Sequence, residues 1–455
     1  MEAVIDLGRI VNLKRRMRLS SVNLLLSPSS RRAMRSLREA RRRALRRPHV
    51  VSAFLQLDDP YSYLLAHYLP SLASHYDIDL RLHLCEARGD DYQPAPEMLA
   101  EYAIYDCARL ARELGIPFLD KGSSPPVEHR LSMLDMIASC DGDAVFEDEL
   151  LQALKVFWRG DAEAAARRSA GADIRGVSAA VIARSQKRQA RLGHYNSAML
   201  HYAGEWFWGV DRLHYLVQRL EQLSAAKHNT HHPLLTSIEQ SMQVALPVAP
   251  PTASKDLPPL EFFHSVRSPY SYLGLLRAAQ IANAFGLTLD IRPVLPMVMR
   301  GMQVPKLKLL YILKDAAREA QRRDIAFGRL SDPVGAATER CLAVFCYARS
   351  EKRGLEFLSN AGEAIWANAT DLATDAGMRK VTARTGLFWP DVKAAMASGA
   401  WRSEAAENRD SMMASGSWGV PTMRLGDFVS WGQDRDWLLL RHIEELCDTG
   451  DGILV

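Results

Sequence analysis

The sequence is poor in the residues and runs that redox-active and membrane-spanning proteins need. It has six cysteines but no Cys-x-x-Cys pair. No apolar run approaches the roughly 18 residues that a membrane-spanning helix requires. We also find no secretory signal pattern, and therefore expect a cytoplasmic protein whose cysteines are reduced and mostly buried. These are Cys85, Cys107, Cys140, Cys341, Cys346 and Cys447.

A metal site is not expected either. His228, His231 and His232 lie close together in the sequence, but no nearby cysteine or acidic residue completes a set of ligands. We interpret this cluster as a polar loop.

Positive charge is concentrated in the first residues of the chain. Residues 1–48 carry fourteen Lys and Arg against three acidic residues, a net charge of +11, so the other 407 residues sum to −7. The segment has no aromatic residue for base stacking, and we see no clear nucleic-acid site. We interpret it as a solvated helical arm packed on the body. An organelle transit peptide and a weak contact with anionic lipid or nucleic acid are the alternatives.

The rest of the chain, long enough for two or three domains, contains an internal repeat. Residues 59–64 (Asp-Pro-Tyr-Ser-Tyr-Leu) match residues 268–273 (Ser-Pro-Tyr-Ser-Tyr-Leu) at an offset of 209, and residues 208–212 match residues 431–435 at 223. Ordered matches at nearly constant spacing indicate two copies of one domain. The matches between these motifs pair Tyr102, Asp106, Ala108, Arg109, Ile116, Phe118 and Trp158 with Tyr311, Asp315, Ala317, Arg318, Ile325, Phe327 and Trp366.

The repeat predicts the domain boundaries. We expect a basic arm (1–48), a first copy (49–223), a linker (224–259), a second copy (260–447) and a tail (448–455). The polar, proline-containing linker is predicted to lack regular structure. Each copy should run strand, turn, helix, strand, helical middle, hairpin and helix, an order typical of an α/β thioredoxin-like domain with an all-α insertion. The strands and hairpins are expected at 50–57, 78–84 and 199–207, and at 261–266, 287–293 and 422–430.

The turn at residues 268–272 organises the second copy. Ser268 is placed to cap the following helix, and Pro269 falls at its first position, where no N–H is needed. A hydroxyl at a helix N-terminus faces free N–H groups and the positive end of the helix dipole, so it is well placed to hold an anion. The alternative is an ordinary helix cap without a ligand.

Three motifs of the second copy carry a family resemblance. They are residues 268–272 after the opening strand, residues 418–422 (Trp-Gly-Val-Pro-Thr), and residues 431–435 (Trp-Gly-Gln-Asp-Arg) before the last helix. Together they resemble the 2-hydroxychromene-2-carboxylate isomerases and kappa-class glutathione transferases of the DsbA-like thioredoxin superfamily. The resemblance covers the whole second copy and, more weakly, the first. It implies two tandem thioredoxin-like domains, of which the second is the active copy.

The resemblance also implies that the bound thiol is that of glutathione. Ser268 and Ser271 stand where disulfide oxidoreductases of this fold carry two cysteines, and hydroxyls cannot exchange a disulfide. Ser268 would instead donate a hydrogen bond to the glutathione sulfur and lower its pKa.

Other positions of the family's glutathione site are matched as well. Val420 would precede a cis Pro421 and pair with the cysteinyl backbone of the tripeptide. Asp434, helped by Gln433, would bind the α-amino group of the γ-glutamyl end. A plain turn at Val420 and Pro421, and a simple helix cap at Asp434, are the alternatives. Arg435 is interpreted as structural.

The chain departs from the family at three places. Residues 300–305 (Arg-Gly-Met-Gln-Val-Pro) lack the Asn of the family's Gly-Asn-x-Pro loop. In the first copy Asp59 replaces the serine, and a carboxylate there would repel a thiolate. Residues 195–199 also contain no proline. We interpret the first copy as a degenerate partner that supplies an interface; a distinct site that uses Asp59 as a base is the alternative.

These observations favour a glutathione-dependent isomerase or transferase that acts on a small electrophilic or aromatic substrate. A non-catalytic thioredoxin-fold binding or scaffold protein is the first alternative. A DsbA-like oxidoreductase that lacks its Cys-x-x-Cys is the second. We expect the two copies to pack together, in place of the homodimer that single-domain relatives form.

Overall fold

The computed structural model describes residues 22–86, 95–119, 129–169, 176–227, 233–251, 254 and 256–451. These residues fall into two compact units. The N-terminal unit comprises residues 37–245 and 305–308, and the C-terminal unit comprises residues up to 36, 246–304 and 309 onward. The His228, His231 and His232 cluster, the first 21 residues of the basic arm and the last four residues of the tail lie outside the described residues.

A four-stranded mixed sheet lies at the centre of the N-terminal unit. Its strand order is β2-β1-β3-β4. The central strand β1 pairs in parallel with β2 and antiparallel with β3, and β3 forms a hairpin with β4. All but one position of β1 is buried, as its apolar sequence predicts. The strands are β1 (His49–Leu55), β2 (Ile78–Leu84), β3 (Met199–Tyr202) and β4 (Glu205–Trp208).

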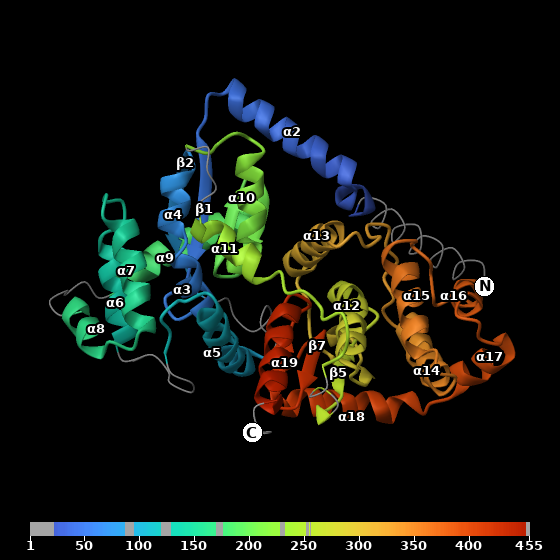
Figure 1. Ribbon diagram of the computed structural model, residues 1–455. Coiled ribbons are helices and arrows are strands. Elements are labelled where there is room, and N and C mark those ends of the chain that lie inside the picture. Colours follow the sequence, from blue (N-terminus) through green and yellow to red (C-terminus); the bar gives the residue numbers. More distant parts are fainter. Residues whose placement is uncertain are drawn as a thin grey trace. The chain divides into compact units, whose positions relative to one another are not determined.

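Helices pack around this sheet (Figure 1). Those between β2 and β3 form the expected helical insertion: α5 (Pro96–Glu113), α6 (Arg130–Ser139), α7 (Phe146–Trp158), α8 (Ala162–Ser169) and α9 (Val177–Leu192). The others are α3 (Pro60–Ala66), α4 (Leu69–His75), the 3₁₀ turn η2 (Val210–Arg212), α10 (Leu213–Glu221) and α11 (Pro233–Ser241).

Helix α11 corrects one prediction. The linker was expected to lack regular structure, and this is wrong for residues 233–241. Leu235 and Ile238 lie one helical turn apart and are both buried, and α11 packs against α10 and α4. Burial of this apolar stripe stabilises the helix despite the polar composition around it.

The C-terminal unit has a sheet of the same design. Its order is β6-β5-β7-β8, with β5 parallel to β6 and antiparallel to β7, and with β7 and β8 in a hairpin. All five residues of β5 are buried. The strands are β5 (Leu260–His264), β6 (Leu289–Pro293), β7 (Thr422–Leu425) and β8 (Phe428–Trp431). The predicted class, α/β with two thioredoxin-like regions, is confirmed by these two sheets and their helices.

The helices of the C-terminal unit follow the same plan. Helix α12 (Pro269–Phe285) leaves β5, and α19 (Asp436–Asp451) ends the unit. Between β6 and β7 lie η4 (Met297–Arg300), α13 (Lys306–Arg322), α14 (Ala336–Ser350), α15 (Gly354–Trp366), α16 (Asp375–Arg384), α17 (Trp389–Ala397) and α18 (Trp401–Ala414). Helix α12 packs on α15 at Gly362, where an added Cβ would come within 2.5 Å of the Tyr272 ring.

The part of the basic arm that the structure describes is helical. Helix α2 (Pro28–Ala44) has no buried residue. Just before it, Asn23 accepts a hydrogen bond from the Leu330 amide at 3.0 Å, and Leu26 is buried. Within α2, Arg31 donates to the side chain of Gln321 at 2.8 Å. These contacts attach the start of the arm to the C-terminal unit.

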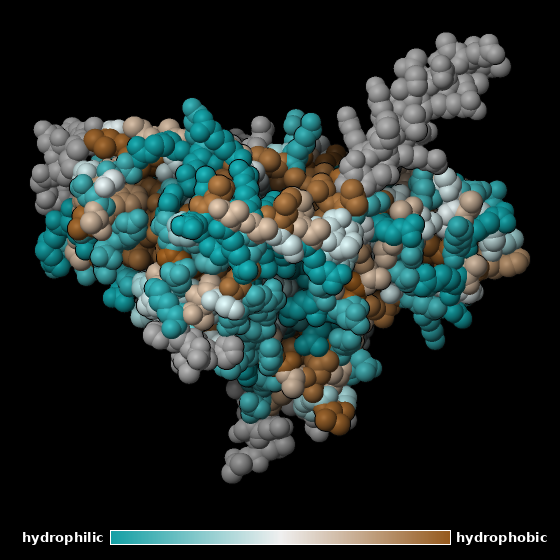
Figure 2. All heavy atoms as spheres, turned by 90° about the horizontal axis from the view of Figure 1, so that it is seen from above, coloured by the Kyte–Doolittle hydropathy of each residue, from teal (hydrophilic) through white to brown (hydrophobic). Residues whose placement is uncertain are grey.

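The face drawn in Figure 2 is covered mainly by hydrophilic side chains, with hydrophobic ones interspersed. Among the residues that the structure describes, none of the helices is both long enough and apolar enough to cross a membrane.

Candidate functional site

The site begins where β5 ends. The chain turns so that the Ser268 amide donates to the Ser265 carbonyl at 2.9 Å. Ser268 has extended backbone angles and caps α12, its hydroxyl accepting from the Ser271 amide at 3.0 Å. Pro269 is the first residue of the helix, as predicted. Ser268 remains partly exposed, whereas Ser271 is buried and accepts from the Ser265 amide at 3.4 Å.

A second segment meets this cap from the far end of the sequence. The Ser268 hydroxyl donates to the carbonyl oxygen of Val420 at 3.1 Å. The peptide bond between Val420 and Pro421 is cis, as the resemblance implied. The Pro421 carbonyl in turn accepts from the Gly432 amide at 2.9 Å. The structure therefore brings Ser268, Val420 and Pro421 together and places the end of β8 beside them.

Gln433 and Asp434 follow directly after Gly432. Gln433 is buried, and its Nε2 donates to the Glu319 carboxylate at 3.2 Å. Its Oε1 is buried with no hydrogen-bond partner among the described residues. Asp434 is bent back toward the chain, so that a Cβ added at Gly432 would lie 2.6 Å from Asp434 Oδ1. A glycine with φ of +109° permits this close approach.

Arg300, the first residue of segment 300–305, makes a contact at this site that sequence reasoning did not predict. It ends η4 and donates to the Trp418 carbonyl at 3.1 Å. Trp418 lies against Trp431, with ring centroids 4.7 Å apart. Burial, together with the nearby Arg409, lowers the pKa of the Arg300 guanidinium below its usual value. No local pattern signals this contact, because 118 residues separate its partners.

Hydrogen bonds to the buried Asp315 support the turn at residues 268–272 from the protein interior. Tyr270 donates to Asp315 at 2.8 Å, and Arg318 also donates to Asp315. Burial lowers the pKa of His264, the last residue of β5, to about 3, so its imidazole is neutral. Arg435 is almost completely buried, in agreement with its interpretation as structural.

The N-terminal unit repeats the framework of this turn. Tyr61 donates to Asp106 at 2.9 Å, as Tyr270 does to Asp315. The indole of Trp158 donates to the Leu57 carbonyl at 2.9 Å. At the matching place, the indole of Trp366 donates to the Val266 carbonyl at 3.2 Å. Each residue of the N-terminal unit named here and its counterpart in the C-terminal unit are 209 positions apart, or 208 for the two tryptophans, as the sequence repeat predicts.

The two units differ at the capping residue and at the position of Pro421. Asp59 caps α3 by accepting from the amides of Tyr61 and Ser62 at 3.1 and 3.2 Å, and from the Ser62 hydroxyl at 2.7 Å. Burial raises the pKa of Asp59, although hydrogen bonds from Ser62 and Ser197 oppose the shift. The place of Pro421 is taken by Ala198, whose carbonyl accepts from the Gly209 amide at 2.7 Å.

No cysteine is part of either turn, but Cys85 lies close to the N-terminal turn, its Sγ donating to the carbonyl of Leu55 at the end of β1 at 3.4 Å. All six are free thiols; Cys85, Cys107, Cys341 and Cys447 are buried, and Cys140 and Cys346 are partly exposed. Among the described residues, no group of His, Cys, Asp and Glu side chains has the arrangement of a metal site.

Two curated relatives match part of the chain. The 2-hydroxychromene-2-carboxylate isomerase of Pseudomonas putida is 25% identical over 196 residues, which cover 41% of this chain and 95% of the relative. That of Sphingobium xenophagum is 25% identical over 186 residues, covering 39% and 93%.

Solved structures match over a similar length. A selenomethionine 2-hydroxychromene-2-carboxylate isomerase is 24% identical, covers 43% of this chain and 99% of its own, and has a TM-score of 0.38. The cytosolic disulfide reductase DsbM from Pseudomonas aeruginosa with GSH is 17% identical, covers 41% and 98%, and has a TM-score of 0.30. Residues 259–444 match the family model of the DSBA-like thioredoxin domain, so the second half of the chain has a DsbA-like thioredoxin fold.

Proposed function

We propose that the C-terminal unit is a glutathione-dependent isomerase or transferase in which Ser268 stabilises the glutathione thiolate. One observation carries the proposal: a partly exposed hydroxyl caps α12 and contacts the backbone of Val420 directly before Pro421. The curated isomerases that are 25% identical align with part of this chain over nearly their whole length, and residues 259–444 match the DSBA-like thioredoxin domain.

The residues present suit a bound thiolate rather than a protein disulfide. Both positions of the turn are serines, and the six cysteines lie elsewhere. The N-terminus of α12 offers a positive dipole end and the Ser268 proton, and both favour the anionic form of a sulfur. When bound, glutathione supplies a thiol that adds reversibly to an electrophilic carbon.

The other end of the tripeptide is assigned to the segment after β8. The buried Gln433 Oε1, without a donor among the described residues, is an acceptor that suits an ammonium group. Asp434 adds the negative charge. Val420 would pair with the cysteinyl backbone. No hydrogen bond from the Val420 amide is found within the described part of the chain, so that amide is available.

We further propose that the two units arose by duplication of one domain. The matching sheet orders and the repeated Tyr–Asp and Trp–carbonyl hydrogen bonds support this origin. Asp59 makes the N-terminal turn unsuited to a thiolate, so we assign it a structural role. The free thiols suit a reducing compartment, which supports a cytoplasmic location.

The test is glutathione titration of the full chain, with the ultraviolet absorbance of the thiolate followed against pH. Wild type is expected to bind glutathione with a lowered thiol pKa, and Ser268→Ala to lose that shift. Ser268→Thr keeps a hydroxyl and should retain much of it.

The control is Thr374→Ala. Thr374 caps α16 by accepting from the Gly377 amide at 3.0 Å, so this variant also loses a helix cap, but far from the site along the chain. It should leave the thiol pKa unchanged. An unshifted thiol pKa in Ser268→Ala, or failure of wild type to bind glutathione, would favour the non-catalytic scaffold.

A further inference from the structure

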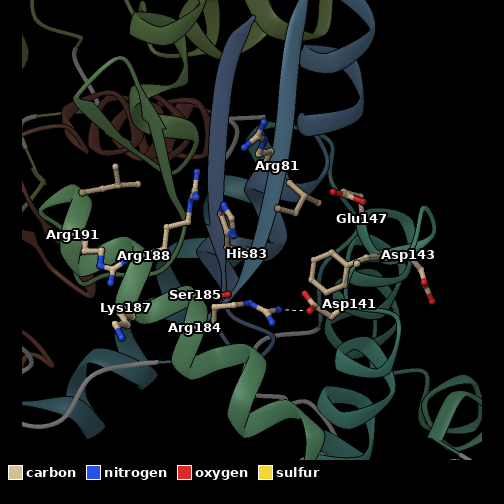
Figure 3. A pocket seen from close by; sticks show the side chains of 14 residues that line it. Arg81, His83, Asp141, Asp143, Glu147, Arg184, Ser185, Lys187, Arg188 and Arg191 are labelled. Carbon is tan, nitrogen blue, oxygen red and sulfur yellow. Dashed lines mark hydrogen bonds and ion pairs between the residues drawn. The ribbon is translucent and has the colours of Figure 1, made fainter. Parts of the chain in front are cut away.

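A pocket of about 780 Å³ lies in the N-terminal unit, apart from the turn at Asp59 (Figure 3). Its walls come from the edge strand β2, from α9, and from the turn between α6 and α7 with the start of α7. Its volume falls within the range typical of small-molecule sites, about 300–1,000 Å³. None of the proposed glutathione-binding residues contributes to it.

The pocket is lined by more positive than negative side chains. Lys187, Arg188 and Arg191 lie on α9, and Arg81 lies on β2. Among the described residues, no ion pair or hydrogen bond is found for the side chains of these three α9 residues. Arg81 is already paired with Asp79 at 2.5 Å. The remaining charged lining residues are Arg184, which is ion-paired with Asp141, and Asp143 and Glu147 on the opposite wall.

Arg188 is the cation that faces the interior of the pocket. Figure 3 shows its side chain directed toward the strand that carries Arg81 and His83. His83 stacks on Phe54, with ring centroids 4.7 Å apart. Its Nε2 is buried and has no hydrogen-bond partner among the described residues. Burial, reinforced by Arg188, Arg81 and Arg184, lowers the pKa of His83 to about 4, so a neutral imidazole lies among cations.

The pocket has apolar surface as well. Leu82 on β2, Phe146 on α7 and Leu192 on α9 belong to its lining. Three cations without a partner in the part of the chain that the structure describes, beside a neutral imidazole, suit a group with two negative charges, such as a phosphate monoester near pH 7. The apolar side chains suit an organic substituent on that group.

We propose that this pocket binds a small organic phosphate, whose phosphoryl group contacts Arg188 and the cations around it and whose organic part packs on Leu82 and Phe146. The ligand is a monoester of low molecular weight and not a polymer, since the site is a pocket with an acidic wall formed by Asp141, Asp143 and Glu147. A long polyanion would be repelled by that wall.

Calorimetric titration of the full chain with phenyl phosphate tests the proposal. Arg188→Gln is expected to weaken binding by about tenfold or more, because a charge-assisted hydrogen bond to the phosphoryl group is lost. Asp141→Asn frees Arg184 and should tighten binding by about threefold. Arg167→Gln is the control: Arg167 is an exposed arginine of the same unit, paired with Glu163 and outside the pocket, and its loss should change nothing.

Three further probes decide the ligand class. Inorganic phosphate should bind more weakly than phenyl phosphate, and benzoate, with one charge, should also bind more weakly. If inorganic phosphate bound as tightly as phenyl phosphate, the organic part would have no role in binding. If benzoate bound as tightly as phenyl phosphate, the pocket would not require two negative charges. The proposal fails as a whole if Arg188→Gln binds phenyl phosphate like wild type. The third probe is a single-stranded oligonucleotide. The proposal also fails if Arg188→Gln weakens binding of this oligonucleotide but not of phenyl phosphate.

Discussion

The hydroxyl of Ser268 donates a hydrogen bond to the carbonyl oxygen of Val420, 3.1 Å away and 152 positions distant in the sequence. The same hydroxyl accepts from the Ser271 amide at 3.0 Å. Because a hydroxyl has one proton, donation to a bound sulfur must replace the bond to Val420. Rotation of the hydroxyl proton therefore exchanges the bond to Val420 for the proposed thiolate contact, while the helix cap, in which the same oxygen accepts from Ser271, is kept.

Replacement of Ser268 by Asp separates the cap from the thiolate contact. Aspartate caps helices about as well as serine, and Asp59 does so in the N-terminal unit. We expect Ser268→Asp to keep the helix cap but to lose the hydrogen bond to the Val420 carbonyl, at a cost of about 1 kcal/mol in unfolding free energy. Repulsion between the carboxylate and the thiolate should weaken glutathione binding by at least about tenfold. Chemical denaturation and calorimetry measure the two effects; glutathione binding equal to wild type would contradict the assigned role.

Gly432→Ala tests the position of Asp434. The new Cβ would lie 2.6 Å from Asp434 Oδ1, and φ at this position is +109°. We expect a loss of about 1–3 kcal/mol in stability from the backbone and weaker glutathione binding from displacement of the carboxylate. Gly416→Ala is the matched control, since Gly416 also has a positive φ but no atom near its added Cβ. If both variants bind glutathione alike, Asp434 has no role in binding.

The lowered pKa of His264 predicts that the free energy of unfolding decreases in acid. Its pKa is lowered from 6.5 to about 3 by burial, so the folded state binds fewer protons than the unfolded state between these values. Its contribution to stability is complete above pH 6.5 and is lost as the pH falls toward 3, by up to about 1.4 kcal/mol per pH unit. In His264→Leu this slope should be absent. Urea denaturation of both proteins across this range gives the difference, and parallel curves would refute the prediction.

The raised pKa of Asp59 predicts the opposite effect of pH on the free energy of unfolding. Burial raises its pKa above the ordinary 3.8, so the folded state prefers the protonated acid, and ionisation at higher pH costs stability. Asparagine caps a helix comparably but cannot ionise. The advantage of Asp59→Asn over wild type in unfolding free energy should therefore grow as the pH rises above about 4. A constant difference from pH 3 to pH 7 would show that Asp59 is not destabilised by ionisation.

Local sequence patterns predicted the parts of the site that depend on near neighbours. Ser268 and Pro269 begin α12 as their residue types predict, and Pro421 is cis, which the family resemblance and not the local pattern implied. The opening strand was placed at 261–266, whereas β5 ends at His264, because the next residues already form the turn that places Ser268.

The contacts that were missed join distant parts of the chain. Gln433 reaches Glu319 across 114 positions, and Arg300 reaches Trp418 across 118. Neither has a periodic or turn signal, since each depends on how α13 and η4 pack beside the hairpin. The basic side of α9 was overlooked for a different reason. A run of Arg and Lys on a helix normally indicates a solvated face, and only the fold shows that β2 lies opposite it.

The Tyr–Asp hydrogen bond behind each turn is nearly identical in length, 2.9 Å in one unit and 2.8 Å in the other, although one turn presents a carboxylate and the other a hydroxyl. The hydrogen bond that supports the turn is therefore the same whether the capping residue is an aspartate or a serine. A different residue at the capping position therefore changes the group that the turn presents, a carboxylate in one unit and a hydroxyl in the other, without altering the hydrogen bond behind it.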